Sequence, residues 1–126
     1  MKLLKLVNAQ RLGNDGDNGN TAPLSTNPDL QAAAQAYAEH LAADGQLSHT
    51  DGSRLGDRVA DAGYRWSTVG ENLARGPSPA DAVSAWMANA VDRANMLNPA
   101  FVDIGIGIAI RPDGQIVWCI DIAAPK

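Results

Sequence analysis

Apolar residues recur with helical spacing through the first half of the chain. After position 28 they stand at i, i+3, i+4, i+7 and i+11, which predicts one long helix with a single apolar stripe. Asn27 is placed to cap this helix, and Pro28 suits its first position. Gly45 follows as the expected stop signal. This helix is rich in alanine, which favours helix formation and lets a neighbouring layer approach closely.

Shorter helices follow from the same spacing and from capping residues. Ser78 is the expected cap of a helix that begins at Pro79, and Asp81 occupies the capping-box position three residues after Ser78. The residues from 13 to 28 are rich in Gly, Asn, Asp and Pro, which is typical of a loop. Further short helices are predicted over residues 3–12, 53–62 and 92–97.

The last quarter of the chain changes to a period of two. Isoleucines alternate with Gly and Ala over residues 101–110, which predicts a strand whose small residues face a closely packed neighbour. The turn residues at 111–114 and the alternation over 116–122 complete a β-hairpin. A third strand is predicted around 67–74, with Glu71 near its middle. Because burying a lone charge is costly, Glu71 needs a partner, and this need indicates a site.

These elements predict an α+β protein. Helices dominate the first three quarters, and two of the three strands come at the end. Helices on one or both faces of a mainly antiparallel sheet would bury the apolar stripes of both. The 126 residues have the size of one domain, so we expect residues 1–126 to fold as a single unit.

Composition and charge argue against two classes of protein, nucleic-acid-binding and membrane-spanning proteins. The formal net charge is −4 and no run of Lys or Arg exists, so the electrostatic footprint of a nucleic-acid-binding protein is missing. No apolar run approaches the roughly 18 residues of a membrane span. The apolar start over residues 1–7 turns polar too early for a signal peptide and is assigned to a helix. A cytoplasmic location and the earlier removal of a leader both stay open.

Two residues with reactive side chains receive structural assignments. Cys119 lies in an apolar strand, where a thiol acts as a small buried hydrophobe, whereas a reactive thiol needs an accessible, electropositive setting. As a single cysteine it forms no internal disulfide. His40 lies beside the apolar stripe of its helix, so we assign it to the solvated surface.

Three segments place polar groups between small neighbours: 48–50, 70–73 and 92–99. In their order and spacing, the whole chain resembles the CAP (SCP) superfamily, named for cysteine-rich secretory proteins, antigen 5 and pathogenesis-related class 1 proteins. It is most similar to the small bacterial branch of that superfamily. The resemblance is carried by residues 6–11, 28–38, 48–50, 63–64, 70–73, 85–87, 93–99 and 104–107.

The resemblance implies an α-β-α sandwich with a central cleft. Two histidines and two acidic residues line that cleft and in some members hold a divalent metal. Matched residue by residue, the first histidine is His49, and the glutamate of the Gly-Glu-Asn motif is Glu71. The second histidine should directly precede the Arg-Ala-Asn-Met-Leu run, where this sequence has Asp92. The other acidic position falls near residues 86–89, which contain no carboxylate.

The predicted cleft set is therefore His49, Glu71 and Asp92, with Asn72 and Ser48 as further cleft or ligand-binding residues. One imidazole with two carboxylates would shift metal preference from Zn²⁺ towards Mn²⁺, Mg²⁺ or Ca²⁺. A structural alternative uses the same residues. Asp92 would cap the helix over 92–97 or pair with a basic neighbour, and His49 and Glu71 would hydrogen-bond each other without metal.

Two classes of function follow. The resemblance implies a secreted or envelope protein, and we expect a monomeric, non-catalytic module that binds a lipid-like or sterol-like ligand, or a protein partner, through the cleft. The alternative is a metal-assisted hydrolase or peptidase with Glu71 as general base beside His49 and Asp92.

The location of an apolar ligand follows from the small residues. A pocket is expected between the strand over 101–110 and the alanine-rich helix, with ordinary close packing as the alternative. A contiguous apolar groove would favour a ligand, and a flat apolar patch would favour a protein partner.

Overall fold

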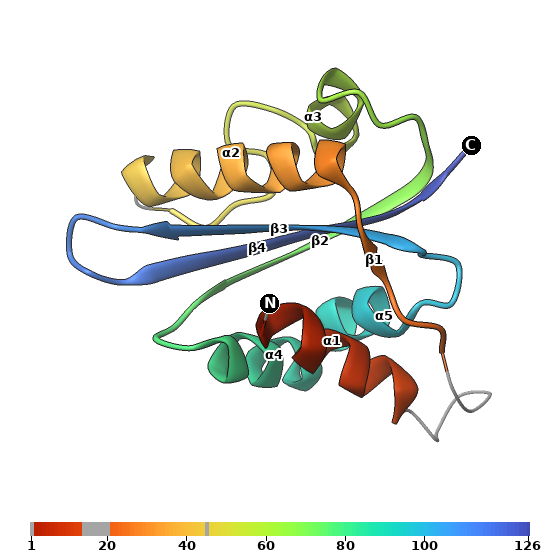
Figure 1. Cartoon of the computed structure of the whole chain (residues 1–126). Helices are drawn as coiled ribbons and strands as arrows, with labels where there is room; N and C mark the ends of the chain where they lie inside the picture. The colour runs from red at the N-terminus through yellow and green to blue at the C-terminus, as the bar shows by residue number, and fades with distance from the viewer. Residues whose placement is uncertain (1, 14–20, 45) are drawn as a thin grey trace.

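Three layers of secondary structure make up the fold (Figure 1). The computed structural model describes residues 2–13, 21–44 and 46–126. A four-stranded sheet lies between α2 and α3 on one face and α1, α4 and α5 on the other. This is the predicted α+β architecture and the α-β-α sandwich that the resemblance implies. In chain order the elements are α1 (Lys2–Leu12), β1 (Ser25–Thr26), α2 (Pro28–Asp44), α3 (Leu55–Asp61), β2 (Trp66–Arg75), α4 (Pro79–Ala88), α5 (Ala90–Leu97), β3 (Asp103–Ile110) and β4 (Ile116–Pro125).

The sheet has the strand order β1-β3-β4-β2 and mixed direction. β4 pairs antiparallel with both β2 and β3, and the β3–β4 pair is the predicted hairpin. β1 pairs parallel with β3, with Ser25 opposite Asp103. The sequence missed β1, which falls in the segment predicted as a loop, because two residues are too few to show a period. β2 lies at the sheet edge opposite β1, and it carries Glu71.

Capping residues begin the helices largely as predicted. Asn27 Oδ1 accepts hydrogen bonds from the N–H groups of the first turn of α2, and Ser78 Oγ accepts one from Asp81 N at 3.2 Å. α5 differs, because Asn89 caps it and Asp92 lies in its first turn. The capping role considered for Asp92 is therefore wrong. The stop signal at Gly45 and the loop residues 14–20 lie outside the described part of the chain.

α2 lies directly on β3. A Cβ atom added at Gly105 would stand 2.1 Å from the backbone of Leu30, and one at Gly107 would stand 2.1 Å from the backbone of Ala34. Such distances are far below van der Waals contact, so only glycine fits at these two positions. The small residues of β3 therefore serve close packing. At these two glycines there is no room for a ligand between the strand and the alanine-rich helix. Farther along the same two elements, Ala42 and Ala43 of α2 and Ala109 of β3 line an open hollow of about 470 Å³, so the expected pocket stays a prediction there.

Two glutamines of α2 cover the edge of β3 beyond the short β1. The side-chain amide of Gln31 accepts from the N–H of Ile106 at 2.9 Å and donates to the carbonyl of the same residue. Gln35 bonds Ile108 in the same way, with both distances 2.9 Å. These amides satisfy backbone groups that would otherwise offer an edge for another strand.

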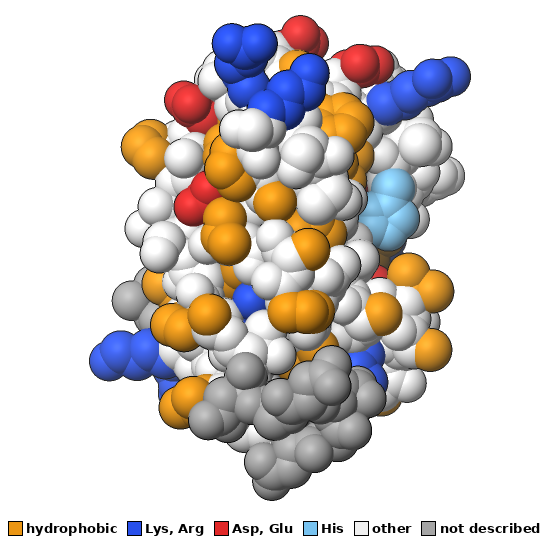
Figure 2. Space-filling view, turned by 90° about the vertical axis from the view of Figure 1, so that its right-hand side faces the viewer, with side chains coloured by type: hydrophobic (Ala, Val, Ile, Leu, Met, Phe, Trp, Pro, Cys, Tyr) orange, Lys and Arg blue, Asp and Glu red, His pale blue; other side chains and the backbone are white. Residues whose placement is uncertain are grey.

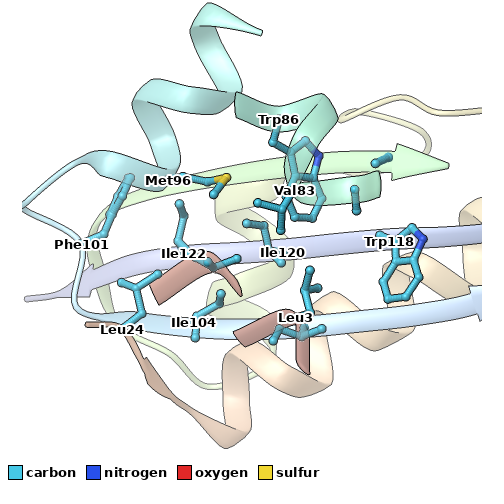
Figure 3. Close-up of a cluster of buried hydrophobic side chains, with 14 residues drawn as sticks. Leu3, Leu24, Val83, Trp86, Met96, Phe101, Ile104, Trp118, Ile120 and Ile122 are labelled. Atoms are coloured by element: carbon cyan, nitrogen blue, oxygen red, sulfur yellow. The ribbon is translucent and has the colours of Figure 1, made fainter. Parts of the chain in front are cut away.

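The largest apolar core lies between the sheet and helices α1, α4 and α5 (Figure 3). Isoleucines at alternate positions of β3 and β4 point to this side, and Trp86 reaches them from α4. The indole N–H of Trp86 donates to the carbonyl of Leu73 at 3.0 Å, so its polar atom is also satisfied. The labelled members in Figure 3 are Leu3, Leu24, Val83, Trp86, Met96, Phe101, Ile104, Trp118, Ile120 and Ile122.

Arg11 is a buried cation in this layer that the sequence did not reveal. Its guanidinium donates to the carbonyls of Ala22, Met96, Asn98 and Phe101 at 2.7 to 3.1 Å. These bonds fix the connection from α5 to β3 against the end of α1. Arg11 therefore helps to position α5, the helix that carries Asp92, relative to the sheet.

Candidate functional site

His49 and Glu71 meet at the β2 edge of the sheet, as the resemblance implies. Glu71 lies near the middle of β2, and His49 lies in the connection between α2 and α3. The distance from His49 Nδ1 to Glu71 Oε1 is 2.9 Å. The Glu71 side chain is 1% exposed and that of His49 is 53% exposed. The imidazole is therefore the part of this pair that solvent reaches.

Arg58 of α3 completes the pair, and the sequence analysis did not identify it. Its Nη2 donates to Glu71 Oε1 at 2.9 Å and to Oε2 at 2.8 Å, and its side chain is 10% exposed. Its Nη1 donates to the carbonyls of His49 and Ser53, each at 3.0 Å. The guanidinium carbon stands 3.5 Å from the centre of the Tyr37 ring. One side chain thus joins β2, the His49 loop and α2.

Two further buried groups of β4 touch Glu71 from the side. Asp121 lies directly opposite Glu71 in the β2–β4 register and is fully buried. The thiol of Cys119 stands 3.7 Å from Glu71 Oε2 and from Asp121 Oδ1. The predicted burial of Cys119 is confirmed, but it lies at a small polar cluster within its apolar surroundings. We call Arg58, Glu71, Cys119 and Asp121 the buried polar cluster.

The pKa values of the two buried carboxyl groups, Glu71 and Asp121, shift in opposite directions. Burial alone would raise the pKa of Glu71, but the hydrogen bond from His49, the neighbouring Asp121, and the charge and hydrogen bonds of Arg58 hold that pKa below its ordinary value. Burial and the adjacent Glu71 raise the pKa of Asp121 well above its ordinary value. The surroundings therefore favour the ionised form of Glu71 and the protonated form of Asp121. Burial likewise raises the pKa of the Cys119 thiol, which disfavours the thiolate.

The other residues predicted for the cleft are Asp92, Asn72 and Ser48. Asp92 is half-buried, and burial raises its pKa while the charge of His49 opposes that rise. Asn72 is buried on the α5 side, where its Nδ2 donates to the Asp92 carbonyl at 2.8 Å and its Oδ1 accepts from Asn95. Asn72 thereby positions α5. The Ser48 carbonyl accepts from the Tyr37 hydroxyl, and Ser48 Oγ accepts from the N–H of Thr50, so Ser48 shapes the His49 loop.

The predicted metal set differs from the group that the fold gathers most tightly. Among the described residues, Glu71, Cys119 and Asp121 offer three ligand atoms that lie within 4.8 Å of one another. His49 and Asp92 are not members of that group. The assignment of a metal to His49, Glu71 and Asp92 stays a prediction.

An open hollow of about 510 Å³ lies between α2 and α3, beside Arg58. Three alanines of α2 and Ala62, which directly follows α3, line it together with the stacked rings of Tyr37 and His40, whose centres are 5.9 Å apart. Asp51 and Asp61 also line the hollow. His40 is half-exposed, as predicted, and its Nε2 stands 3.4 Å from Asp51 Oδ2. The hollow therefore combines an apolar lining with two carboxylates.

Hydrophobic side chains at the surface do not form a broad patch on the face shown in Figure 2. They stand in small groups, with polar side chains and backbone between them. The large apolar side chains that are exposed among the described residues come from helices, a strand end and connecting segments: Leu12, Leu47, Val91, Val102 and Ile110. This face lacks the flat apolar area that would favour a protein partner.

Comparison with protein families gives one match over most of the chain. The sequence model of the cysteine-rich secretory protein family matches residues 4–122. The uncharacterized protein YkwD of Bacillus subtilis is 33% identical over 110 residues, which are 84% of this chain and 40% of the relative. The chain thus spans about 40% of the length of the curated relative that it matches.

Two of the solved structures with the same fold are a bacterial outer surface protein and a bacterial extracellular protein. An outer surface protein of Borrelia burgdorferi has a TM-score of 0.85 at 21% identity, over 99% of this chain and 91% of the other. An extracellular protein of Bacillus anthracis with an SCP domain has a TM-score of 0.82 at 20% identity, over 98% of this chain and 39% of the other. None of the described helices combines the length and apolar character needed to cross a bilayer.

Proposed function

The chain belongs to the cysteine-rich secretory protein family, and we propose that it acts as a non-catalytic binding module of a bacterial extracellular or envelope protein. In this proposal, the ligand binds in the hollow between α2 and α3. The names of the structural relatives, an outer surface protein and an extracellular protein, support the location. The state of Glu71 supports the non-catalytic role.

Glu71 is the residue that a hydrolase would need as general base, and its surroundings oppose that role. A general base must reach a water molecule and have a pKa near the working pH. Glu71 is 1% exposed, and both of its oxygens accept from Arg58. Its pKa is lowered, with the hydrogen bonds and charge outweighing burial. This single carboxylate, buried and already paired, is the observation that carries the proposal.

The hollow has the properties of a small-molecule site. Its volume of about 510 Å³ falls within the range of roughly 300–1,000 Å³ that such sites occupy. Its alanines and stacked rings suit an apolar body. Asp51 and Asp61 carry negative charge there, while the positive charge of Arg58 is balanced by Glu71. The proposed ligand is therefore apolar with a neutral or positively charged head group, because these carboxylates repel an anion.

Three probes of equal chain length test the site: hexylamine, hexanol and hexanoate, each titrated while backbone amide shifts are recorded by NMR. We expect saturable shifts at residues 32–37, 51–53 and 58–62, with affinity in the order amine, alcohol, acid. Ala36→Phe should abolish these shifts because it fills the hollow from an exposed position. Ala43→Phe, at an exposed position of the same helix outside the hollow, is the matched control.

Two outcomes would contradict the proposal. Shifts that persist unchanged in Ala36→Phe would place binding elsewhere, and tightest binding of hexanoate would oppose the charge argument. Hydrolysis of a peptide or ester by the wild-type protein, lost in Glu71→Gln, would restore the hydrolase alternative with Glu71, His49 and Asp92.

A further inference from the structure

We propose that Arg58 is a built-in cation that takes the place of a divalent metal in this cleft. The resemblance implies such a metal for some members of the family. The residues of this chain do not fit one, because a guanidinium already pairs with the central carboxylate. The His49–Glu71 pair is then a metal-independent element that α3 holds in position.

The hydrogen bonds of Glu71 leave no place for a metal–oxygen bond. A carboxylate has about four lone-pair positions. Oε1 accepts from His49 Nδ1 at 2.9 Å and from Arg58 Nη2 at 2.9 Å. Oε2 accepts from Arg58 Nη2 at 2.8 Å and contacts the Cys119 thiol at 3.7 Å. A metal ion could bind Glu71 only by displacing one of these donors.

The charge of Glu71 is also balanced without a metal. Arg58 Nη2 stands 2.8 Å from Glu71 Oε2, and the two side chains are 10% and 1% exposed. A dication bound to Glu71 would stand beside this guanidinium, and like charges close together in a buried site repel each other strongly.

Arg58 is difficult to displace, since several elements hold it at once. It cannot leave by losing its proton, because a guanidinium stays charged at any ordinary pH. Its Nη1 donates to the carbonyls of His49 and Ser53, and its guanidinium carbon stands 3.5 Å from the centre of the Tyr37 ring. Removing Arg58 from Glu71 would also release the loop that carries His49.

The proposal predicts that removing the cation uncovers a metal site. Without Arg58, the ligand atoms of Glu71, Cys119 and Asp121 would remain within 4.8 Å of one another. Carboxylate and thiolate are both ligands of zinc. Zinc is titrated by calorimetry into the wild-type protein, Arg58→Met and Arg58→Met/Glu71→Gln. We expect Arg58→Met to bind zinc at least about tenfold more tightly than the wild type, and the double variant to lose this gain.

Equal zinc affinity of the wild type and Arg58→Met would overturn the proposal. So would specific binding of zinc by the wild type that is lost in His49→Ala or Glu71→Gln. A measurement on the wild type alone covers the case in which Arg58→Met does not fold. The Nε–H signal of Arg58 and the ring signals of His49 are followed by NMR during zinc addition. We expect no saturable shift shared by these signals, and such a shift would show that zinc displaces the guanidinium.

Discussion

Alternate residues of β4 face two different environments. One side of the strand faces the apolar core, and the other side faces the buried polar cluster. Ile120 and Ile122 point towards α1, α4 and α5 and join the continuous apolar core. Cys119 and Asp121 point to the other side, where Glu71 and Arg58 complete the buried polar cluster. On the first side stability comes from burial, which is insensitive to pH. On the second side, stability depends on the balance of charges within the buried polar cluster.

The largest effect is expected on the apolar side. Trp86→Ala should lower the free energy of unfolding by about 3–5 kcal/mol, because it removes a fully buried indole and leaves a cavity. It also leaves the carbonyl of Leu73 without its donor. Urea denaturation should show this loss equally at neutral and mildly acidic pH. Ile110→Ala, at a side chain that is 70% exposed, is the control and should change stability by less than about 0.5 kcal/mol.

A large effect on the polar side should depend on pH. Arg58→Met should cost about 3 kcal/mol near neutral pH, because it leaves Glu71 buried without its cation. The pKa of Glu71 is depressed in the folded state, so its contribution is present above its unfolded pKa and is lost as pH falls through its folded pKa. Denaturation curves should therefore show a smaller difference below about pH 4. A difference that is constant with pH would contradict the charge balance.

Asp121→Asn should raise the free energy of unfolding, whereas Arg58→Met should lower it. The folded pKa of Asp121 is raised by burial and by Glu71, so above its unfolded pKa the unfolded chain loses a proton that the folded chain keeps. Stability therefore falls as pH rises from that unfolded value. Asparagine removes this loss and should stabilise the protein by on the order of 1 kcal/mol near neutral pH. Thermal unfolding should show no gain in strong acid, and a destabilised variant at neutral pH would show that Asp121 is ionised.

The smallest effect concerns His49. Its hydrogen bond to Glu71 raises its pKa, and the charge of Asp92 adds to that rise. The stabilisation is present below the unfolded pKa and is lost as pH rises through the folded pKa. Since the imidazole is half-exposed, we expect at most a few tenths of a kcal/mol. A proton NMR titration should show a larger fall of the His49 pKa in Glu71→Gln than in Asp92→Asn. A larger fall in Asp92→Asn would show that Asp92 of α5, rather than Glu71, is the main cause of the raised His49 pKa.

The sequence predicted the helices and strands whose apolar residues recur with a clear period. It also indicated that Glu71 needs a partner. The alternation in β3 and β4 predicted the hairpin, and Glu71 in a half-buried strand indicated a needed partner. β1 was missed because two residues show no period. Pairing of His49 with Glu71 depended on the resemblance, since no local pattern joins residues 22 positions apart.

Arg58 was missed for a different reason. It precedes Val59, an inward residue of a short amphipathic helix, and a charged residue there looks like part of the solvated face. The need of Glu71 for a partner was visible, but ten Lys and Arg residues could have met it. Arg11 gave a better signal, because it follows Leu3 and Val7 on the same apolar stripe of α1. A cation at helical spacing from buried apolar residues is a candidate for a buried role.

The most direct test of the central claim is the pKa of the Glu71 side chain itself. A carbon-detected NMR titration of the Glu71 carboxyl group, in wild type and Arg58→Met, measures it without assuming a ligand. We predict a wild-type pKa below the ordinary value for glutamate and a higher pKa in the variant, because Arg58 supplies the compensating charge. A wild-type pKa raised towards neutrality would contradict a paired, non-catalytic Glu71 and would make it a general base.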